Sequence, residues 1–124
     1  AGRDVTLVAI GRMAGVARAA AEALAREGVA AEIIDPRCLV PLDEALLLES
    51  VRRTHRALVL DAAPLRYGVT AEIAAVIGEK AFDWLDAPVG RLGAVDTPVP
   101  ISRSLEPLVC PTPEKVVAAV RAMM

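Results

Sequence analysis

The sequence has few of the residues on which small sites are usually built. Its 124 residues include one Phe, one Tyr and one Trp, so the core must come from Val, Leu, Ile and Ala, within a hydrophobic content of 55%. Two cysteines, Cys38 and Cys110, do not make a disulfide framework or a metal site. With His55 as the single histidine, no Ser-His-Asp or Cys-His catalytic arrangement can be assembled.

Long apolar runs and charge of one sign are also lacking. No segment approaches the roughly 18 continuous apolar residues of a membrane helix. The 14 basic and 16 acidic residues are spread along the chain, which predicts no binding to nucleic acid. No charged-then-apolar leader opens the sequence, so a cytoplasmic location is expected. Ala1 stands where an initiator Met would be, which indicates an excised piece or removal of the Met by processing.

What is present is an alternation of short aliphatic runs with helical spacing. Runs resembling buried strands are followed by segments in which apolar residues recur every three or four positions. This pattern predicts βαβ units, a parallel sheet covered on both faces and a single α/β domain over residues 1–124. The expected strands are 5–10, 31–35, 57–61 and 89–95; the expected helices are 13 to about 26, 43 to about 53, 70 to about 82, and 113–124.

The segment 35–43 organises this pattern, since it leads from the second strand into the second helix. Pro36 and Pro41 forbid helix between them. Asp43 is expected to cap the next helix, with Leu42 and Leu47 as a hydrophobic staple. Leu46, Leu47 and Val51 are predicted to face the core, as are Ile73, Val76 and Ile77 in the third helix, which Thr70 should cap. Thr112-Pro113-Glu114 starts the last helix.

Candidate chemistry lies at the carboxyl ends of the strands, where open α/β sheets bind ligands. Gly11 and Gly15 could bring a helix N-terminus to a phosphate, although a tight turn explains them as well, and the dinucleotide and P-loop fingerprints are missing. Asp35 and Asp61 could form an acid–base pair or simply end their strands.

Four further side chains have alternative interpretations. Cys38 is either a reactive thiol beside Arg37 or, more simply, a small buried apolar group. His55, between Arg53 and Arg56, is expected to be solvated in a turn. Tyr67 and Trp84 could anchor an interface or cap the core.

Six motifs carry a resemblance, and they occur in the order typical of one family. The chain resembles the C-terminal domain of the beta subunit of thiamine-diphosphate-dependent 2-oxoacid dehydrogenases (pyruvate, branched-chain and acetoin types) and, more distantly, that of transketolase. The motifs are residues 4–13, Pro41-Leu42-Asp43, Ala63-Pro64, Gly68 with Ala71-Glu72-Ile73-Ala74, Asp86-Ala87-Pro88-Val89, and Asp96-Thr97-Pro98-Val99-Pro100.

This resemblance implies a three-layer α/β sandwich with a mainly parallel sheet of about five strands, one more than the pattern predicts. It also implies that the domain itself holds no catalytic residue, cofactor or metal. Thiamine diphosphate and Mg²⁺ would belong to the parent enzyme, between its alpha subunit and the N-terminal domain of the beta subunit. The isolated domain is therefore not expected to contain a complete active site.

In this family the C-terminal domain contributes to subunit association, with the alpha subunit and a second beta subunit as partners. In some bacterial members it also docks the small basic peripheral-subunit-binding domain of the dihydrolipoyl acyltransferase core. The resemblance transfers this docking role to Asp86, in Leu85-Asp86-Ala87-Pro88, and to the carboxylate of Met124. Alternatively, Asp86 has no docking role and is only a turn residue that precedes Pro88.

The sequence departs from the family pattern at three places. Ala62 replaces an acid, Tyr67-Gly68-Val69-Thr70 replaces a glycine-rich turn, and His55 stands where Gly is usual. Because Tyr67 occupies a position that could require the positive φ of Gly, a different turn is expected.

Three competing interpretations remain at this point. The same domain could come from a transketolase or a deoxyxylulose-phosphate-synthase-like enzyme. The chain could also be a free-standing α/β module that binds a phosphorylated ligand at Gly11 to Gly15, or an independent homodimeric adaptor.

Overall fold

The computed structural model describes residues 2–124; Ala1 lies outside them. It contains a fully parallel sheet of four strands, β1 (Val5–Ala9), β2 (Ala31–Ile34), β3 (Ala57–Pro64) and β4 (Gly90–Ala94), in the order β2-β1-β3-β4. The alternating pattern predicted these four parallel strands, and the α/β prediction is confirmed. The fifth strand that the resemblance implied is not formed by residues 2–124.

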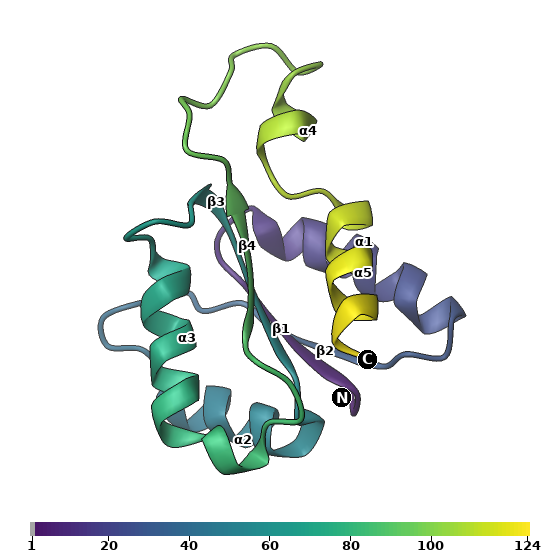
Figure 1. Ribbon diagram of the computed structural model, residues 1–124, viewed down its shortest axis with the longest axis vertical. Helices are drawn as coiled ribbons and strands as arrows, with labels where there is room; N and C mark the ends of the chain where they lie inside the picture. The colour runs from purple at the N-terminus through teal and green to yellow at the C-terminus, as the bar shows by residue number, and fades with distance from the viewer. Residues whose placement is uncertain (1) are drawn as a thin grey trace.

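Helices cover both faces of the sheet in three layers (Figure 1). Helices α1 (Met13–Arg26) and α5 (Pro113–Met123) pack together on one face. Helices α2 (Glu44–Thr54) and α3 (Val69–Lys80) pack on the other. A 3-10 turn, η1 (Phe82–Trp84), follows α3, and the short helix α4 (Glu106–Val109), which the sequence pattern did not predict, lies beyond β4.

The core forms two apolar layers because successive strand residues point to opposite faces. Val5, Leu7 and Ala9 face α1 and α5, whereas Val8 and Val59 face α2 and α3. All five are at most 1% exposed. Continuous aliphatic strands are what a sheet covered on both faces requires.

The segment 35–43 begins α2 as predicted, but two side chains differ from expectation. The Asp43 carboxylate accepts the backbone N–H of Leu46 at 3.0 Å, and Leu42 packs against the cluster that contains Leu47. Leu46 is 51% exposed, because its position in the first turn of α2 points away from the sheet. Cys38 is exposed rather than buried, since the proline-containing segment runs over the surface.

Around α3 the structure corrects three predictions. The helix begins at Val69 with Gly68 as its N-cap, so Thr70 lies inside the first turn and caps nothing. Strand β3 continues through Pro64, into residues expected to form a loop. Val76 is only partly buried, unlike its neighbours Ile73 and Ile77.

Two departures from the family pattern keep the left-handed backbone that glycine favours. Tyr67 has φ +52° and His55 has φ +61°. His55 is also the C-cap of α2, where its N–H donates to the Val51 carbonyl oxygen. At Tyr67 a bulky side chain occupies the strained region of positive φ, and the expectation of a turn that differs from the family's stays a prediction.

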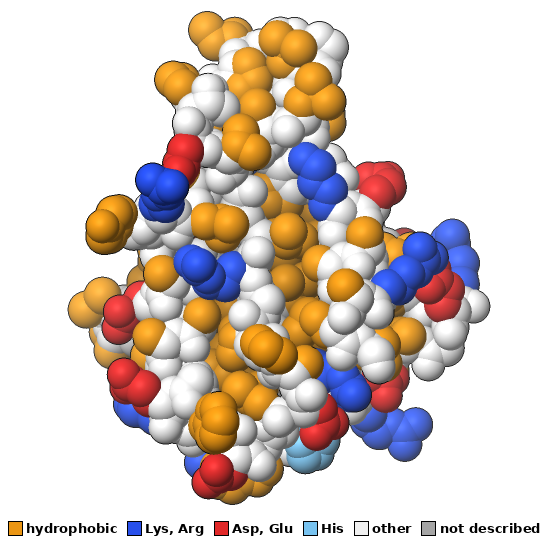
Figure 2. Space-filling view, in the orientation of Figure 1, with side chains coloured by type: hydrophobic (Ala, Val, Ile, Leu, Met, Phe, Trp, Pro, Cys, Tyr) orange, Lys and Arg blue, Asp and Glu red, His pale blue; other side chains and the backbone are white. Residues whose placement is uncertain are grey.

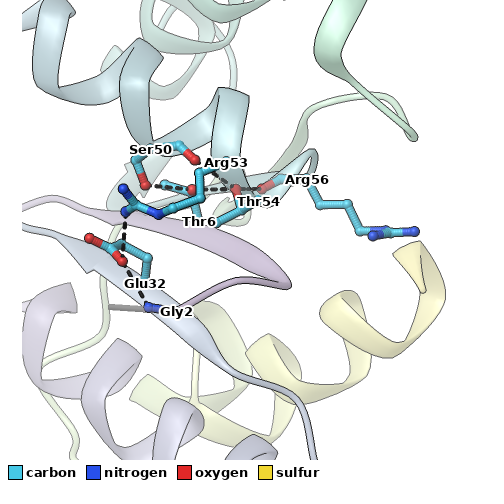
Figure 3. Close-up of polar contacts among 7 residues, drawn as sticks. All are labelled: Gly2, Thr6, Glu32, Ser50, Arg53, Thr54 and Arg56. Atoms are coloured by element: carbon cyan, nitrogen blue, oxygen red, sulfur yellow. Dashed lines mark hydrogen bonds and ion pairs between the residues drawn. The ribbon is translucent and has the colours of Figure 1, made fainter.

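Three buried hydroxyl groups link β1 to α2 (Figure 3). The Thr6 Oγ1 lies 2.8 Å from Ser50 Oγ and 2.7 Å from Thr54 Oγ1. Thr54 in turn donates to the carbonyl oxygens of Ser50, at 3.1 Å, and Arg56, at 3.2 Å. Each hydroxyl supplies one proton, so the cluster is consistent when Ser50 donates to Thr6, Thr6 donates to Thr54, and Thr54 shares its single proton between the two carbonyl oxygens.

No helix among residues 2–124 has the length and apolar character needed to cross a membrane.

Candidate functional site

The glycine turn after β1 does not leave a helix N-terminus open to a phosphate. Gly11 has φ +58°, which makes the tight turn. The first N–H groups of α1, on Met13, Ala14 and Gly15, donate to backbone carbonyl oxygens three residues earlier, at 3.1 to 3.3 Å. Arg12, the residue after Gly11, forms an ion pair with Glu106 of α4, so its guanidinium already has an anionic partner.

The two aspartates at the same edge are not brought together as a pair. Asp35 follows β2 and Asp61 lies in β3, with β1 between these strands. Asp35 Oδ2 accepts Arg37 Nε at 2.8 Å, and Asp61 Oδ1 accepts the backbone N–H of Ala62 at 2.7 Å. Strands two places apart in a sheet are about 10 Å apart. Each carboxylate serves its own loop, and the acid–base hypothesis finds no support in the geometry.

The Asp86 turn lies at the opposite edge of the sheet, where β3 and β4 begin. The Asp86 N–H donates to the His55 carbonyl oxygen at 2.9 Å. His55 Nδ1 lies 2.7 Å from the Trp84 carbonyl oxygen, which can only accept, so Nδ1 carries the proton. The Arg52 guanidinium stacks over the Trp84 ring, 4.5 Å from its centroid. His55 is partly exposed in this turn, as expected, and its ring also ties the end of α2 to the Trp84 carbonyl oxygen.

A single arginine joins the two predicted docking segments, and sequence reasoning missed it. Arg56 Nη2 is 3.6 Å from Asp86 Oδ2, and Arg56 Nε donates to the Met123 carbonyl oxygen at 3.1 Å. Asp86 and the end of α5, which carries Met124, therefore lie at the same end of the molecule. A cation next to the turn after α2 was the available signal, but sequence alone does not pair it with residues 30 and 67 positions away.

A shallow groove runs beside Asp86, between the C-terminal part of α3 and the segment leading into β4. Its lining is mostly apolar and includes Phe82, which is 72% exposed. Two acids, Asp83 and Asp86, lie among these apolar groups. Apolar contact area with acidic groups beside it suits a basic, amphipathic partner.

The largest concentration of exposed apolar side chains is elsewhere, on a lobe formed by residues 95–109, which includes α4. Figure 2 shows hydrophobic side chains gathered over this protruding end of the molecule. Two of the three charged residues of the lobe are paired with the body of the domain, Asp96 with Arg66 and Glu106 with Arg12. The exposed members are Val95, Val99, Ile101, Leu105 and Leu108, which range from 49% to 103% exposed.

Ion pairs also fasten helices to one another on the surface. Arg121 of α5 donates to Glu27 at the end of α1, with Nε 3.0 Å from Oε2, and this hydrogen bond lowers the pKa of the Glu27 carboxyl. Lys80 of α3 pairs with Glu44 of α2, which raises the pKa of the Lys80 ammonium. These pairs stabilise the layers and lie outside the Asp86 groove.

Metal and thiol chemistry find little support among the described residues. Residues 2–124 contain no group of three or more His, Cys, Asp or Glu side chains placed to hold a metal ion. Both cysteines are free thiols; Cys110 is buried, and exposed Cys38 donates its S–H to the Val40 carbonyl oxygen at 3.2 Å. Tyr67 is fully exposed and Trp84 is 41% exposed, so neither caps the core.

Comparison with known families gives one result over nearly the whole chain. The family described as "Transketolase, C-terminal domain" matches residues 1–116. A solved structure described as "Split gene transketolase, inactive beta4 tetramer" superposes with a TM-score of 0.85 at 33% identity. It covers 99% of this chain and 39% of its own.

Two curated relatives place the similarity more narrowly. The acetoin:2,6-dichlorophenolindophenol oxidoreductase subunit beta of Bacillus subtilis is 44% identical over 94% of this chain and 34% of its own length. The mitochondrial pyruvate dehydrogenase E1 component subunit beta-1 of Arabidopsis thaliana is 44% identical over 95% of this chain and 32% of its own. The chain thus spans about a third of the length of these relatives.

Proposed function

The chain belongs to the transketolase C-terminal domain family, and from this premise we propose that it is the non-catalytic assembly domain of a 2-oxoacid dehydrogenase beta subunit. Its parent enzyme would decarboxylate a 2-oxoacid, pyruvate or a branched-chain one, on thiamine diphosphate and pass the acyl group to a lipoyl arm. Thiamine diphosphate and Mg²⁺ are assigned to other parts of that enzyme, and its location to the cytoplasm.

The observation that carries the proposal is the apolar lobe of residues 95–109. An apolar surface on which most charged side chains are paired, here all but Arg103 with partners from residues 2–124, is typical of a surface covered in an assembly. We assign the lobe to contact with a second beta subunit. The solved relative described as a beta4 tetramer supports association between copies of such a chain. The alpha subunit is the further partner that this function requires.

The lobe can be tested with substitutions that do not disturb the core. Ile101 and Leu108 are 103% and 72% exposed, so Ile101→Asp with Leu108→Asp should leave the fold intact. We expect the unaltered chain to self-associate in sedimentation equilibrium as its concentration rises, and the double variant to sediment as a monomer. Val40→Asp is the matched control, because Val40 is 90% exposed but lies outside the lobe.

Two results would contradict this role of the lobe. One is a monomer at every concentration of the unaltered chain. The other is an equal loss of association in the Val40→Asp control.

The second part of the proposal is docking of the basic peripheral-subunit-binding domain of a dihydrolipoyl acyltransferase. Asp86 supports it by geometry: its side chain is 56% exposed, beside an apolar groove and near the C-terminal end of α5, where Met124 lies. Rim charges of this kind favour fast and specific association. Asp86→Asn should weaken binding of the cognate basic domain in a surface plasmon resonance titration, whereas equal binding by the variant would contradict docking through Asp86.

The phospholigand module is the less favoured alternative. The first N–H groups of α1 already donate to carbonyl oxygens, and Arg12 is paired with Glu106. A transketolase-like parent is compatible with the fold. The 44% identity to the two dehydrogenase-type beta subunits favours the first proposal.

A further inference from the structure

The Arg56 side chain is largely buried and contacts both the Asp86 turn and the end of α5. Its guanidinium lies between two segments distant in sequence, with Nη2 3.6 Å from Asp86 Oδ2 and Nε 3.1 Å from the Met123 carbonyl oxygen. The Arg56 side chain is 22% exposed, whereas that of Asp86 is 56% exposed. The Arg56 guanidinium therefore lies on the side of the Asp86 carboxylate that faces the protein interior, and the other side of the carboxylate faces solvent.

The backbone near Arg56 holds the same turn. The neighbouring residue, His55, accepts the Asp86 N–H through its carbonyl oxygen and donates from its ring to the Trp84 carbonyl oxygen. Arg52, one helical turn earlier, stacks on the Trp84 ring. The end of α2 and the residues that follow it thus fix the main chain of the Asp86 turn, and Arg56 acts on its carboxylate.

We propose that Arg56 is the positioning residue of the docking surface: it orients the Asp86 carboxylate toward a basic partner and holds it beside the C-terminal end of α5. This inference rests on the proposed docking function. A carboxylate has two oxygens and about four acceptor sites. With Oδ2 directed toward Arg56, the remaining sites can accept donors of the partner, and less side-chain freedom is lost on binding.

The sign of the effect separates positioning from simple charge. Arg56 is a cation close to the acid that should attract a basic domain. If charge alone mattered, removal of Arg56 would strengthen binding and raise the association rate constant. Positioning predicts the opposite, a weaker complex that dissociates faster, because Asp86 must be ordered at the moment of binding.

The test compares Arg56→Gln and Arg56→Lys with the unaltered chain. The probe is the peripheral-subunit-binding domain of the cognate acyltransferase, and surface plasmon resonance gives both rate constants. We expect Arg56→Gln to weaken binding about tenfold through the dissociation rate constant. Arg56→Lys should recover binding only in part, since one ammonium replaces a planar group that serves two partners.

Arg37→Gln is the matched control, because it also removes one paired cation but at the opposite edge of the sheet, beside Asp35 and outside the lobe of residues 95–109. It should leave the dissociation rate constant unchanged. Circular dichroism melting identifies a variant that fails to fold. If Arg56→Gln fails to fold, the test rests on Arg56→Lys alone. A dissociation rate constant of Arg56→Lys equal to that of the unaltered chain then overturns the proposal.

Failure of the two proposals gives different results. If the unaltered chain does not bind the basic domain, the docking function fails and this inference fails with it. If the unaltered chain binds and Asp86→Asn binds less well, docking stands. In that case, equal or tighter binding by Arg56→Gln overturns the positioning role of Arg56 alone.

Discussion

The hydroxyl of Thr6 in β1 lies 2.7 Å from the hydroxyl of Thr54 in α2, and both side chains are at most 1% exposed. With Ser50 they form a directed chain that ends on backbone carbonyl oxygens. A buried polar cluster stabilises a fold only when each member has a partner. Here the cluster fixes how helix α2 sits on the sheet, immediately before the His55 and Arg56 segment.

Thr6→Val keeps the side-chain shape but removes the central hydroxyl of this chain. Ser50 then loses its acceptor and Thr54 loses its donor, which leaves buried polar groups unsatisfied. We expect the free energy of unfolding to fall by about 1–3 kcal/mol, measured by urea denaturation. A change near zero would contradict the directed hydroxyl chain.

Thr70→Val is the matched control and should have the opposite sign. The Thr70 side chain is 2% exposed, and its hydroxyl has no hydrogen-bond partner among residues 2–124. Replacing a buried, unpaired hydroxyl by a methyl group removes a desolvation cost. The same urea titration should show unchanged or higher stability, by up to about 2 kcal/mol. A loss comparable to that of Thr6→Val would mean that the Thr70 hydroxyl has a partner.

Leu46 and Leu47 are neighbours in α2 with opposite environments. Leu47 is 1% exposed and Leu46 is 51% exposed. Leu47→Ala should lower the free energy of unfolding by about 2–5 kcal/mol through lost burial and a cavity. Leu46→Ala should cost less than about 1 kcal/mol at its half-exposed position. Equal costs in urea denaturation would show that the rotation of α2 about its axis is wrong.

Gly68 is required for space at the start of α3. A Cβ at this position would lie 2.5 Å from the Pro64 carbonyl oxygen, a backbone atom. Gly68→Ala should therefore destabilise the domain by about 1–3 kcal/mol. At Gly78, in the same helix, a Cβ would meet no atom within 4 Å beyond the adjacent residues and the helix's own backbone, so Gly78→Ala should stabilise by up to about 1 kcal/mol. Thermal melting of both variants checks the contrast, and the reverse order would contradict it.

The pair of Glu27 and Arg121 makes stability depend on acid pH. Its hydrogen bond lowers the pKa of Glu27 in the folded chain below the ordinary value of 4.5. The stabilisation is therefore complete above that value and is lost as the pH falls through the lower folded pKa. In Arg121→Gln, the Glu27 carboxyl should titrate nearer 4.5 in a carbon-13 NMR titration. Identical titration curves in both proteins would show that the pair is not formed in solution.

The pattern of apolar residues predicted most of the architecture, because the positions of helices and strands depend largely on residues close in sequence. Aliphatic runs and helical spacing located all four strands and the four long helices. Asp43 and Thr112 cap their helices as expected, since an N-cap depends only on residues three positions away. Prediction failed where a side chain's surroundings come from elsewhere in the chain: Cys38 and Leu46 are exposed, and Thr70 lies one residue too far into its helix to cap it.

For the candidate surfaces, too, some features follow from the sequence and others only from the tertiary structure. The sequence by itself determined the fold class and the family, because these depend on the order of residues along the chain; the docking role of Asp86 is a prediction from the same order. Only the tertiary structure placed Arg56 between Asp86 and Met123, gathered the apolar lobe of residues 95–109 and separated Asp35 from Asp61. The reason is physical: these relationships depend on strand order and on how the helical layers pack, which no short stretch of sequence contains.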